Sequence, residues 1–140
     1  MKQFADKCSK DVNDPFDLLP DEIEYLDANY PQRWQKLSEG EGKYAVQIDE
    51  FVVPCNLSPN RSTLLILIPS GYPLTPLDMF YFAPPISRND DYAIPALIIE
   101  QHFGIEWQRW SRHYDWQPGD DNLISHIEHV KEELDSTALK

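Results

Sequence analysis

The alternation of apolar and polar positions is clearest from Lys43 to Val53, where it predicts a strand. One face of this stretch carries Tyr44, Val46 and Ile48, and the other carries Ala45, Gln47 and Asp49. Because the side chains of a strand point alternately to opposite faces, this pattern is typical of a half-buried strand.

A second pattern, a short apolar run, occurs from Leu64 to Ile68 and from Met79 to Phe82. Short apolar runs that end at prolines indicate buried strands. A further strand is expected from Arg33 to Leu37, with Trp34 pointing inward. In sequence order, these three stretches and Lys43 to Val53 predict a four-stranded antiparallel meander.

Helical patterns flank the strands on both sides. Leu19-Pro20-Asp21-Glu22 opens a short helix that ends near Asn29-Tyr30-Pro31, because proline and acidic residues suit the first turn of a helix. A C-terminal helix follows Asp120 and Asp121, which we expect to cap it. Its apolar residues recur at helical spacing, at Leu123, Ile127, Val130 and Leu134.

The remaining segments lack a clear period. Residues 1–16 are expected to form a mobile arm, and Pro84 to Pro95 and Gly104 to Trp116 are expected to be irregular. Ala96 to Phe103 is too short for its period to separate a strand from a helical turn. The predicted fold class is α+β, a single domain over residues 17–140 with an N-terminal helix, the meander, a proline-rich crossing segment and a C-terminal helix on the sheet.

The connector between the two apolar strands reads Ile68-Pro69-Ser70-Gly71-Tyr72-Pro73-Leu74-Thr75-Pro76. Its prolines fix their φ angles, so we expect a stiff turn that holds the two strands at a set angle. A strand, this I-P-x-x-Y-P-x-x-P motif and a strand that ends in aromatic residues together resemble the core of the ubiquitin-conjugating-enzyme (UBC-like) superfamily.

The resemblance extends from about Leu19 to Leu134. Trp116-Gln117-Pro118 is similar to the W-x-P step that leads into the superfamily's next helix. Glu100 to His113 looks like a divergent bacterial branch that occurs beside ubiquitin-like, activating-enzyme-like and isopeptidase-like proteins. The resemblance implies a UBC-like fold, and structural roles are expected for Tyr72, Pro73, Pro76, Trp116 and Pro118.

The catalytic signature of this superfamily is missing. Its members carry a His-Pro-Asn motif and then a cysteine in the segment that corresponds to residues 87–114, which contains no cysteine. The expected spacing falls near Gln108, and Asn89 is the closest counterpart of the asparagine. A displaced nucleophile would be Cys55 or a non-cysteine group such as His113. For Cys55, which follows Pro54 in a loop, a structural role is favoured, since thioester transfer needs an exposed thiolate and an oxyanion donor.

Basic and aromatic residues gather in one short segment of a chain that is otherwise acidic. Tryptophan and arginine dominate the centres of protein interfaces, so a binding surface is predicted there. The alternative is that the tryptophans belong to the core and the arginines pair with Asp115 and Glu106. The predicted binding residues are Trp107, Arg109, Trp110, Arg112 and His113.

Charge and composition exclude several classes of partner. The chain has 140 residues and a net charge of −12, which argues against binding to nucleic acid or to an anionic membrane. It has no apolar run long enough to span a membrane, and its first residues lack the pattern of a signal peptide. Cys8 and Cys55 indicate no disulfide framework. A cytoplasmic location is therefore expected.

No cofactor or metal is expected from the sequence. His102, Glu106 and His113 could be imagined as ligands, but Gly104 weakens any helix that would align them, and a second close pair of ligands is missing. His126 and His129 fall outside the apolar stripe of the last helix, so we expect them to face solvent.

The expected function follows from the resemblance and the missing cysteine together. The chain is predicted to be a non-catalytic or divergent ubiquitin-conjugating-enzyme-like component of a bacterial ubiquitin-like system. Its expected partners are a ubiquitin-like protein, which it would bind or present, and an activating-enzyme-like protein. The alternative is an active conjugating enzyme with a displaced nucleophile.

Overall fold

The structure, a computed structural model, describes residues 17–39 and 42–139. The mobile arm expected at residues 1–16 lies outside the described residues. The elements follow in the order α1 (Pro20–Asn29), β1 (Trp34–Ser38), β2 (Tyr44–Val52), β3 (Leu57–Ser58), β4 (Arg61–Ile68), β5 (Met79–Ala83), β6 (Ser87–Arg88), β7 (Leu97–His102), β8 (Ile105–Ser111) and α2 (Leu123–Leu139). None of the described helices is long and apolar enough to cross a membrane.

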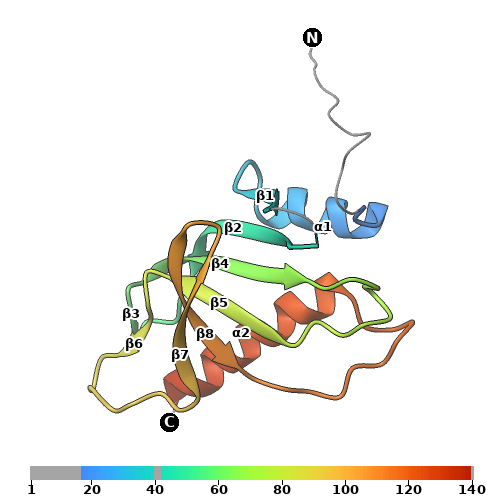
Figure 1. The fold of residues 1–140 in the computed structure, drawn as a ribbon. Helices are drawn as coiled ribbons and strands as arrows, with labels where there is room; N and C mark the ends of the chain where they lie inside the picture. The colour runs from blue at the N-terminus through green and yellow to red at the C-terminus, as the bar shows by residue number, and fades with distance from the viewer. Residues whose placement is uncertain (1–16, 40–41, 140) are drawn as a thin grey trace.

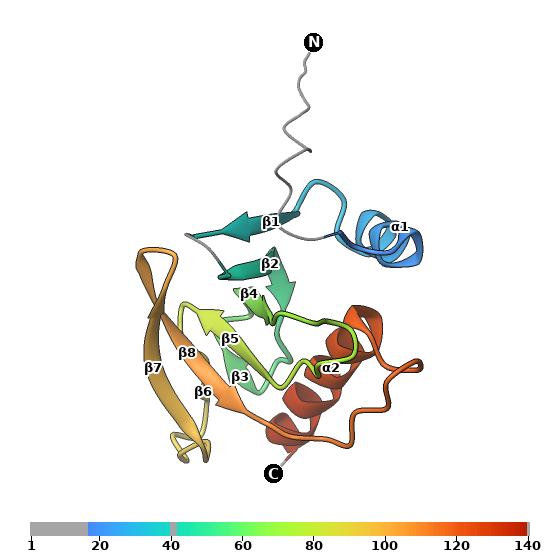
Figure 2. The same cartoon turned by 45° about the vertical axis from the view of Figure 1, so that its right-hand side comes forward.

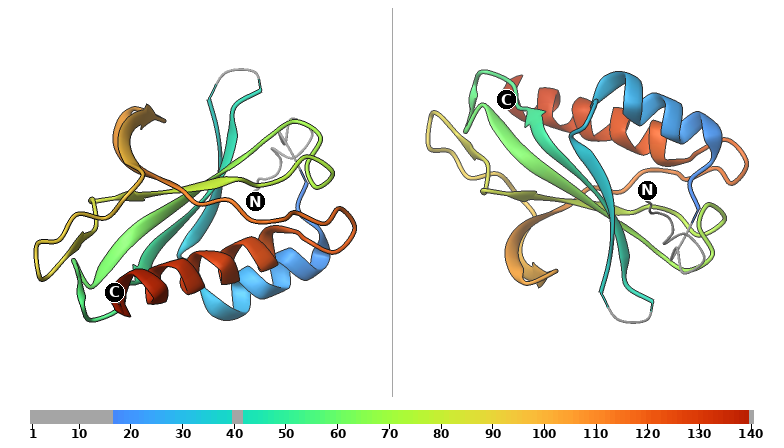
Figure 3. Two further views of the ribbon diagram at one scale, coloured as in Figure 1. Left: turned by 90° about the horizontal axis from the view of Figure 1, so that it is seen from below. Right: turned by 90° about the horizontal axis from the view of Figure 1, so that it is seen from above.

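Six of these strands form one antiparallel sheet in the order β1-β2-β4-β5-β8-β7, and β3 pairs with β6 as a small separate ribbon (Figure 1). Figure 2 shows β1 and β7 at opposite ends of the sheet. Both helices lie on one face of the sheet, and the β7-β8 hairpin curls toward the other side (Figure 3). This arrangement confirms the predicted α+β class with a helix at each end of the described chain.

The first helix begins and ends where its sequence predicts. Pro20 is its first residue, and the acidic residues Asp21 and Glu22 occupy the first turn, where the exposed amide groups favour negative charge. The Glu22 carboxylate also accepts a hydrogen bond from the Leu19 amide at 2.7 Å. The helix ends at Asn29, just before Pro31.

The last helix buries the predicted apolar stripe, but its cap is a different residue. Asn122 Oδ1 accepts hydrogen bonds from the amides of Ile124 at 2.9 Å and Ser125 at 3.2 Å, as an N-cap side chain does. The capping role expected for Asp120 and Asp121 is therefore wrong. Asp121 closes the preceding turn instead, since it accepts a hydrogen bond from the Gln117 amide at 2.7 Å.

The sheet is wider than the predicted meander. Strands β1, β2, β4 and β5 lie where the four predicted strands were placed, but β8 pairs with β5 and β7 completes the edge. The irregular segment predicted from Gly104 to Trp116 is wrong for most of its length, because Ile105–Ser111 is strand β8. Phe103 and Gly104 form the hairpin turn, with φ angles of 53° and 83°. Two consecutive positive φ angles are typical of a type I′ turn, whose twist suits a hairpin.

Apolar side chains are buried on both faces of this sheet. The larger core lies between the sheet and the helices and includes Leu26, Ile66, Phe80, Trp110 and Ile127. The smaller core, on the face away from the helices, consists of four buried residues, Ala45, Leu65, Tyr81 and Trp107. Strand β2 was predicted to be half-buried, yet Ala45 on its polar face is fully buried, because the hairpin brings Trp107 over that face.

Candidate functional site

The segment between β5 and α2, where the resemblance places a nucleophile, is built into the sheet. Gln108 lies in β8, pairs with Phe82 of β5 and is only 7% exposed. Its side-chain amide donates a hydrogen bond to the Ile86 carbonyl and accepts one from the Ile86 amide, both at 2.9 Å. The Trp110 indole donates a third bond to it at 2.9 Å. Gln108 therefore fixes the chain after β5 against β8 and leaves no reactive group exposed.

Cys55 and Asn89, which are far apart in the sequence, meet in the structure. The Asn89 side-chain amide donates a hydrogen bond to the Cys55 carbonyl at 3.0 Å, and its oxygen accepts one from the Ser58 hydroxyl. The Cys55 thiol is exposed and lies 4.0 Å from Asn56 Oδ1. Both polar atoms of Asn89 therefore hold together the loop that carries Cys55.

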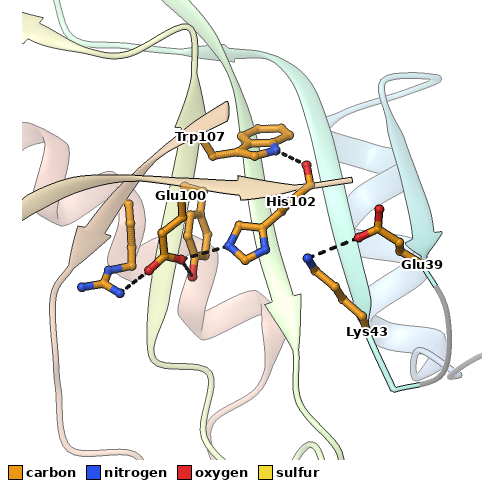
Figure 4. Close-up of polar contacts among 7 residues, drawn as sticks. Glu39, Lys43, Glu100, His102 and Trp107 are labelled. Atoms are coloured by element: carbon orange, nitrogen blue, oxygen red, sulfur yellow. Dashed lines mark hydrogen bonds and ion pairs between the residues drawn. The ribbon is translucent and has the colours of Figure 1, made fainter. Parts of the chain in front are cut away.

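The tryptophans of the predicted binding cluster belong to the two cores. Trp107 points away from the helices and is buried in the smaller core, where its indole donates a hydrogen bond to the His102 carbonyl at 2.9 Å (Figure 4). Trp110 points toward the helices and stacks on Phe80 with ring centroids 5.6 Å apart. Neither indole offers a contact surface to a partner, which removes both from the predicted binding surface.

Arg109 is engaged in a network centred on Glu100. The Glu100 carboxylate accepts hydrogen bonds from the Arg109 guanidinium and, at 3.2 Å, from the Tyr81 hydroxyl. His102 Nε2 lies 3.0 Å from the same carboxylate, and the histidine ring packs edge-on against Tyr81 (Figure 4). Burial opposes ionisation of Glu100, but the bond from His102 and the charge of Arg109 outweigh it and lower its pKa. Burial and the Glu100 charge raise the pKa of Tyr81 to about 12.

Arg112 and His113 differ sharply in exposure. The Arg112 side chain is only 14% exposed, lies 3.4 Å from the Glu133 carboxylate and covers the Trp110 ring at 5.0 Å. The His113 side chain is 66% exposed, and its Nδ1 lies 2.6 Å from Asp78 Oδ1. Of the five predicted binding residues, His113 is the one that is largely open to solvent.

A groove of about 300 Å³ lies beside this His113–Asp78 pair. Its lining is mainly apolar and includes two charged residues, Lys43 and Asp78, a common composition in binding sites. The lining residues are Gly42, Lys43, Tyr44, Leu67, Ile68, Pro69, Pro76, Asp78, Met79 and Tyr81. Among residues 17–39 and 42–139, no three His, Cys, Asp or Glu side chains gather as a metal site.

The proline-rich connector is fastened to both helices. The Tyr72 hydroxyl donates a hydrogen bond to the buried Glu22 carboxylate, and the Leu123 amide donates to both groups, at 2.5 Å and 3.2 Å respectively. The Trp116 indole donates to the Pro73 carbonyl at 3.0 Å and packs against the Tyr72 ring. Pro76 lines the groove, and Pro118 lies in the turn before α2.

The sequence prediction missed a buried histidine on α2. His126 was expected to face solvent, which is wrong, because the residue is fully buried. Its Nε2 donates to the Met79 carbonyl at 3.2 Å, and its Nδ1 accepts from the Tyr114 hydroxyl at 3.0 Å. Burial lowers the pKa of His126 to about 4, so the ring is neutral near pH 7. The sequence spacing could have predicted this burial, since Leu123, His126 and Val130 fall on one helical face.

His129 lies next to this pair, with its ring centroid 4.1 Å from that of Tyr114. Its side chain is 12% exposed rather than solvent-facing, and Nε2 is 4.0 Å from the Glu133 carboxylate. Burial also raises the pKa of Tyr114. The two histidines thus attach the segment after β8 to α2, close to the exposed His113.

One family model accounts for nearly the whole chain. The model described as prokaryotic E2 family E matches residues 18–137. No curated protein and no solved structure is significantly similar to the chain. The match spans both helices and the whole sheet, including the β7-β8 hairpin.

Proposed function

Because the chain belongs to prokaryotic E2 family E, we propose that it is a non-catalytic E2-like component of a bacterial ubiquitin-like protein system. In this role it binds or presents the ubiquitin-like partner in the cytoplasm, and an activating-enzyme-like protein acts in the same system. The family supports an E2-like protein of a bacterial system. The non-catalytic role and the partners are the part that we propose.

The observation that carries this proposal is the burial and hydrogen bonding of Gln108. The spacing of the superfamily's nucleophile falls near this residue, which is buried and makes hydrogen bonds through both atoms of its amide. A thioester requires a thiolate that a second protein can reach. This part of the sheet has neither a thiol nor an accessible side chain at that position.

The surface that we propose for partner binding is the exposed His113–Asp78 pair and the groove beside it. The pair presents a ring nitrogen and a carboxylate at the end of an apolar groove, so it can orient a polar group while the groove buries an apolar side chain. Arg109 and Arg112 are outside this surface, since they pair with Glu100 and Glu133 and neither lines the groove.

The alternative, an active enzyme with a displaced nucleophile, draws on the exposure of Cys55 and of His113. For Cys55 this alternative is weaker, because Asn89, the candidate oxyanion donor in the sequence, already bonds to the Cys55 carbonyl and the Ser58 hydroxyl.

The test is an adduct assay with the ubiquitin-like and activating-enzyme-like proteins of the same system and ATP. We expect no adduct that dithiothreitol cleaves, in the wild type or in Cys55→Ser, and a non-covalent complex with the ubiquitin-like protein. An adduct that disappears in Cys55→Ser but persists in the matched control Cys8→Ser would overturn the proposal. So would an adduct that hydroxylamine cleaves, that persists in Cys55→Ser and that is absent from His113→Gln.

The non-covalent complex supplies a second readout. His113→Ala should weaken it by about tenfold, because a polar contact at the centre of an interface is worth roughly 1.4 kcal/mol or more. Since the His113 side chain is largely exposed, its melting temperature should stay close to that of the wild type. Unchanged affinity in His113→Ala would place the partner elsewhere on the molecule.

A further inference from the structure

Strand β7 ends the sheet and has a partner on only one side. It pairs with β8 from Leu97 to His102 and lies at the end of the strand order. A strand in this position exposes a row of backbone donors and acceptors to which another extended chain can bind.

The register identifies which backbone groups point outward. The Ser111 amide donates a hydrogen bond to the Ala96 carbonyl at 3.3 Å, so residue 96 faces β8. Backbone groups of a strand alternate in direction, and residues 98, 100 and 102 therefore also face β8. The amides and carbonyls of Leu97, Ile99 and Gln101 point to the free edge, where no described residue outside the strand binds them.

The side chains of this edge are apolar and exposed. Ile98 is 47% exposed and Ile99 is 54% exposed, and Ile105 beside the turn is 49% exposed. These isoleucines lie on both faces of the hairpin, because Ile98 and Ile99 are neighbours in one strand. Isolated exposed apolar residues are common in proteins, but two neighbours in an open edge strand with a third in the paired strand beside it are typical of an interaction site.

Protein sheets usually protect such an edge with lysine, proline or a bulge. The other edge of this sheet, β1, carries Lys36 in a strand of five residues. From Leu97 to His102 the β7 strand contains neither lysine nor proline, and its register with β8 runs without a shift. The unprotected edge is thus limited to β7.

We propose that β7 is a docking edge, to which an extended segment of the ubiquitin-like partner adds as one further strand. This inference rests on the proposed function for the identity of the partner. The segment alternates apolar side chains, on the face of Ile98 and Ile105, with lysine or arginine on the face of Glu106.

Charge favours this occupant over a second copy of the chain. The chain carries a net charge of −12, so two copies repel each other, whereas a basic segment is attracted. Two acids are exposed to attract it: Glu106, which lies opposite Gln101 in the hairpin, and Asp91, which precedes the strand in sequence. Glu100 does not contribute, because Arg109 neutralises it.

The probe is a short peptide that alternates valine and lysine, with a peptide that alternates valine and glutamate as its control. Binding is followed by the backbone amide resonances of the protein at millimolar peptide concentrations. We expect the lysine peptide to shift the amides of Leu97, Ile99 and Gln101 most strongly, and the glutamate peptide to bind at least tenfold more weakly.

Two matched variants separate the backbone from the side chain. Ile99→Ala and Ile99→Pro both remove the isoleucine, but only the proline removes the outward amide, and edge strands tolerate proline at such positions. We expect Ile99→Pro to bind the lysine peptide at least tenfold more weakly than Ile99→Ala. Both variants should keep the amide pattern of the folded sheet outside β7, which confirms that the comparison is between folded proteins.

Any one of four results would overturn the inference. The first is that the lysine peptide leaves these three amides unshifted, and the second is that Ile99→Ala and Ile99→Pro bind it equally well. The third is a concentration-dependent dimer that Ile99→Pro abolishes, which would assign the edge to a second copy of the chain. If the ubiquitin-like protein binds the wild type and Ile99→Pro equally, the proposed function stands and the docking edge fails.

Discussion

The two faces of the sheet are built in different ways. The face toward the helices is packed by a continuous core from seven elements, including Phe80, Phe82 and Trp110. The opposite face has four buried residues, and the hairpin above it is held by the ionic network of Glu100. The first face follows from local apolar patterns, whereas the second exists only after a distant hairpin folds over it.

The largest difference between the faces should appear when their tryptophans are removed. Trp110→Ala should lower the free energy of unfolding by about 4 kcal/mol, since it leaves a cavity among stacked rings. Trp107→Ala should lower it by about 3 kcal/mol, because the smaller core lies next to the open groove. Chemical denaturation of both variants measures the two values. A larger loss for Trp107→Ala would show that the face away from the helices dominates the stability of the fold.

The second-largest expected effect is a loss of stability at low pH, caused by His126 on the helix-facing side of the sheet. The pKa of His126 lies near 4 in the folded protein and 6.5 ordinarily, so the unfolded chain binds a proton first as the pH falls. The free energy of unfolding should therefore decrease between about pH 6.5 and pH 4, by about 3 kcal/mol from His126 alone. Denaturation across this range measures the decrease.

The control for this effect is His126→Gln, whose amide can donate to the Met79 carbonyl without titrating. The decrease between pH 6.5 and pH 4 should shrink in this variant. Two acids with lowered pKa values do not interfere over most of this range. Burial opposes ionisation of Glu100, but the bond from His102 and the charge of Arg109 lower its pKa. The pKa of Glu128 is lowered mainly by the hydrogen bond from Tyr25. An unchanged decrease in His126→Gln would assign it to another group.

The smallest expected effect is the loss of stability when one ion pair on each face of the sheet is removed. Arg109 pairs with Glu100 on the hairpin side, and Arg112 pairs with Glu133 of α2. Both arginine side chains are less than one third exposed, so each change to alanine should cost about 1 kcal/mol of stability, through lost packing as well as lost charge. Melting curves of Arg109→Ala and Arg112→Ala measure the loss.

A double-mutant cycle of Arg109→Ala with Glu100→Gln isolates the hairpin pair. Coupling near zero would show that packing rather than charge accounts for the loss. If partner affinity per folded molecule falls in either arginine variant without a change in melting temperature, the arginines contact the partner directly.

Most of the helix-facing side could be predicted from the sequence. The run from Leu64 to Ile68 and the stripe on α2 are local patterns, and they bury the residues that their periods select. The hairpin could not be predicted in the same way. In β8, Trp107 and Arg109 point to one face while Gln108 and Trp110 point to the other, so each face carries one aromatic and one polar residue. The alternation of apolar and polar residues that marks a strand is therefore not visible in the sequence of β8.

For the candidate site, the sequence predicted the missing nucleophile better than it predicted the contacts of the residues that are present. The missing cysteine is a property of the sequence itself, but the hydrogen bonds that bury Gln108 depend on Ile86, 22 residues away. The arginine partners were expected at Asp115 and Glu106, close in sequence. The partners in the structure are Glu100 and Glu133, which only the hairpin and α2 bring near.

The buried carboxylate of Glu22 has a consequence for how the molecule opens. It accepts hydrogen bonds from the amide of Leu19, before α1, and from the amide of Leu123, the first residue of α2, while Tyr72 donates to it from the connector. The N-terminal ends of both helices are thus fastened to a single side chain. Fraying of α1 and fraying of α2 become one cooperative event, so their first amides should exchange with solvent hydrogen at a common rate.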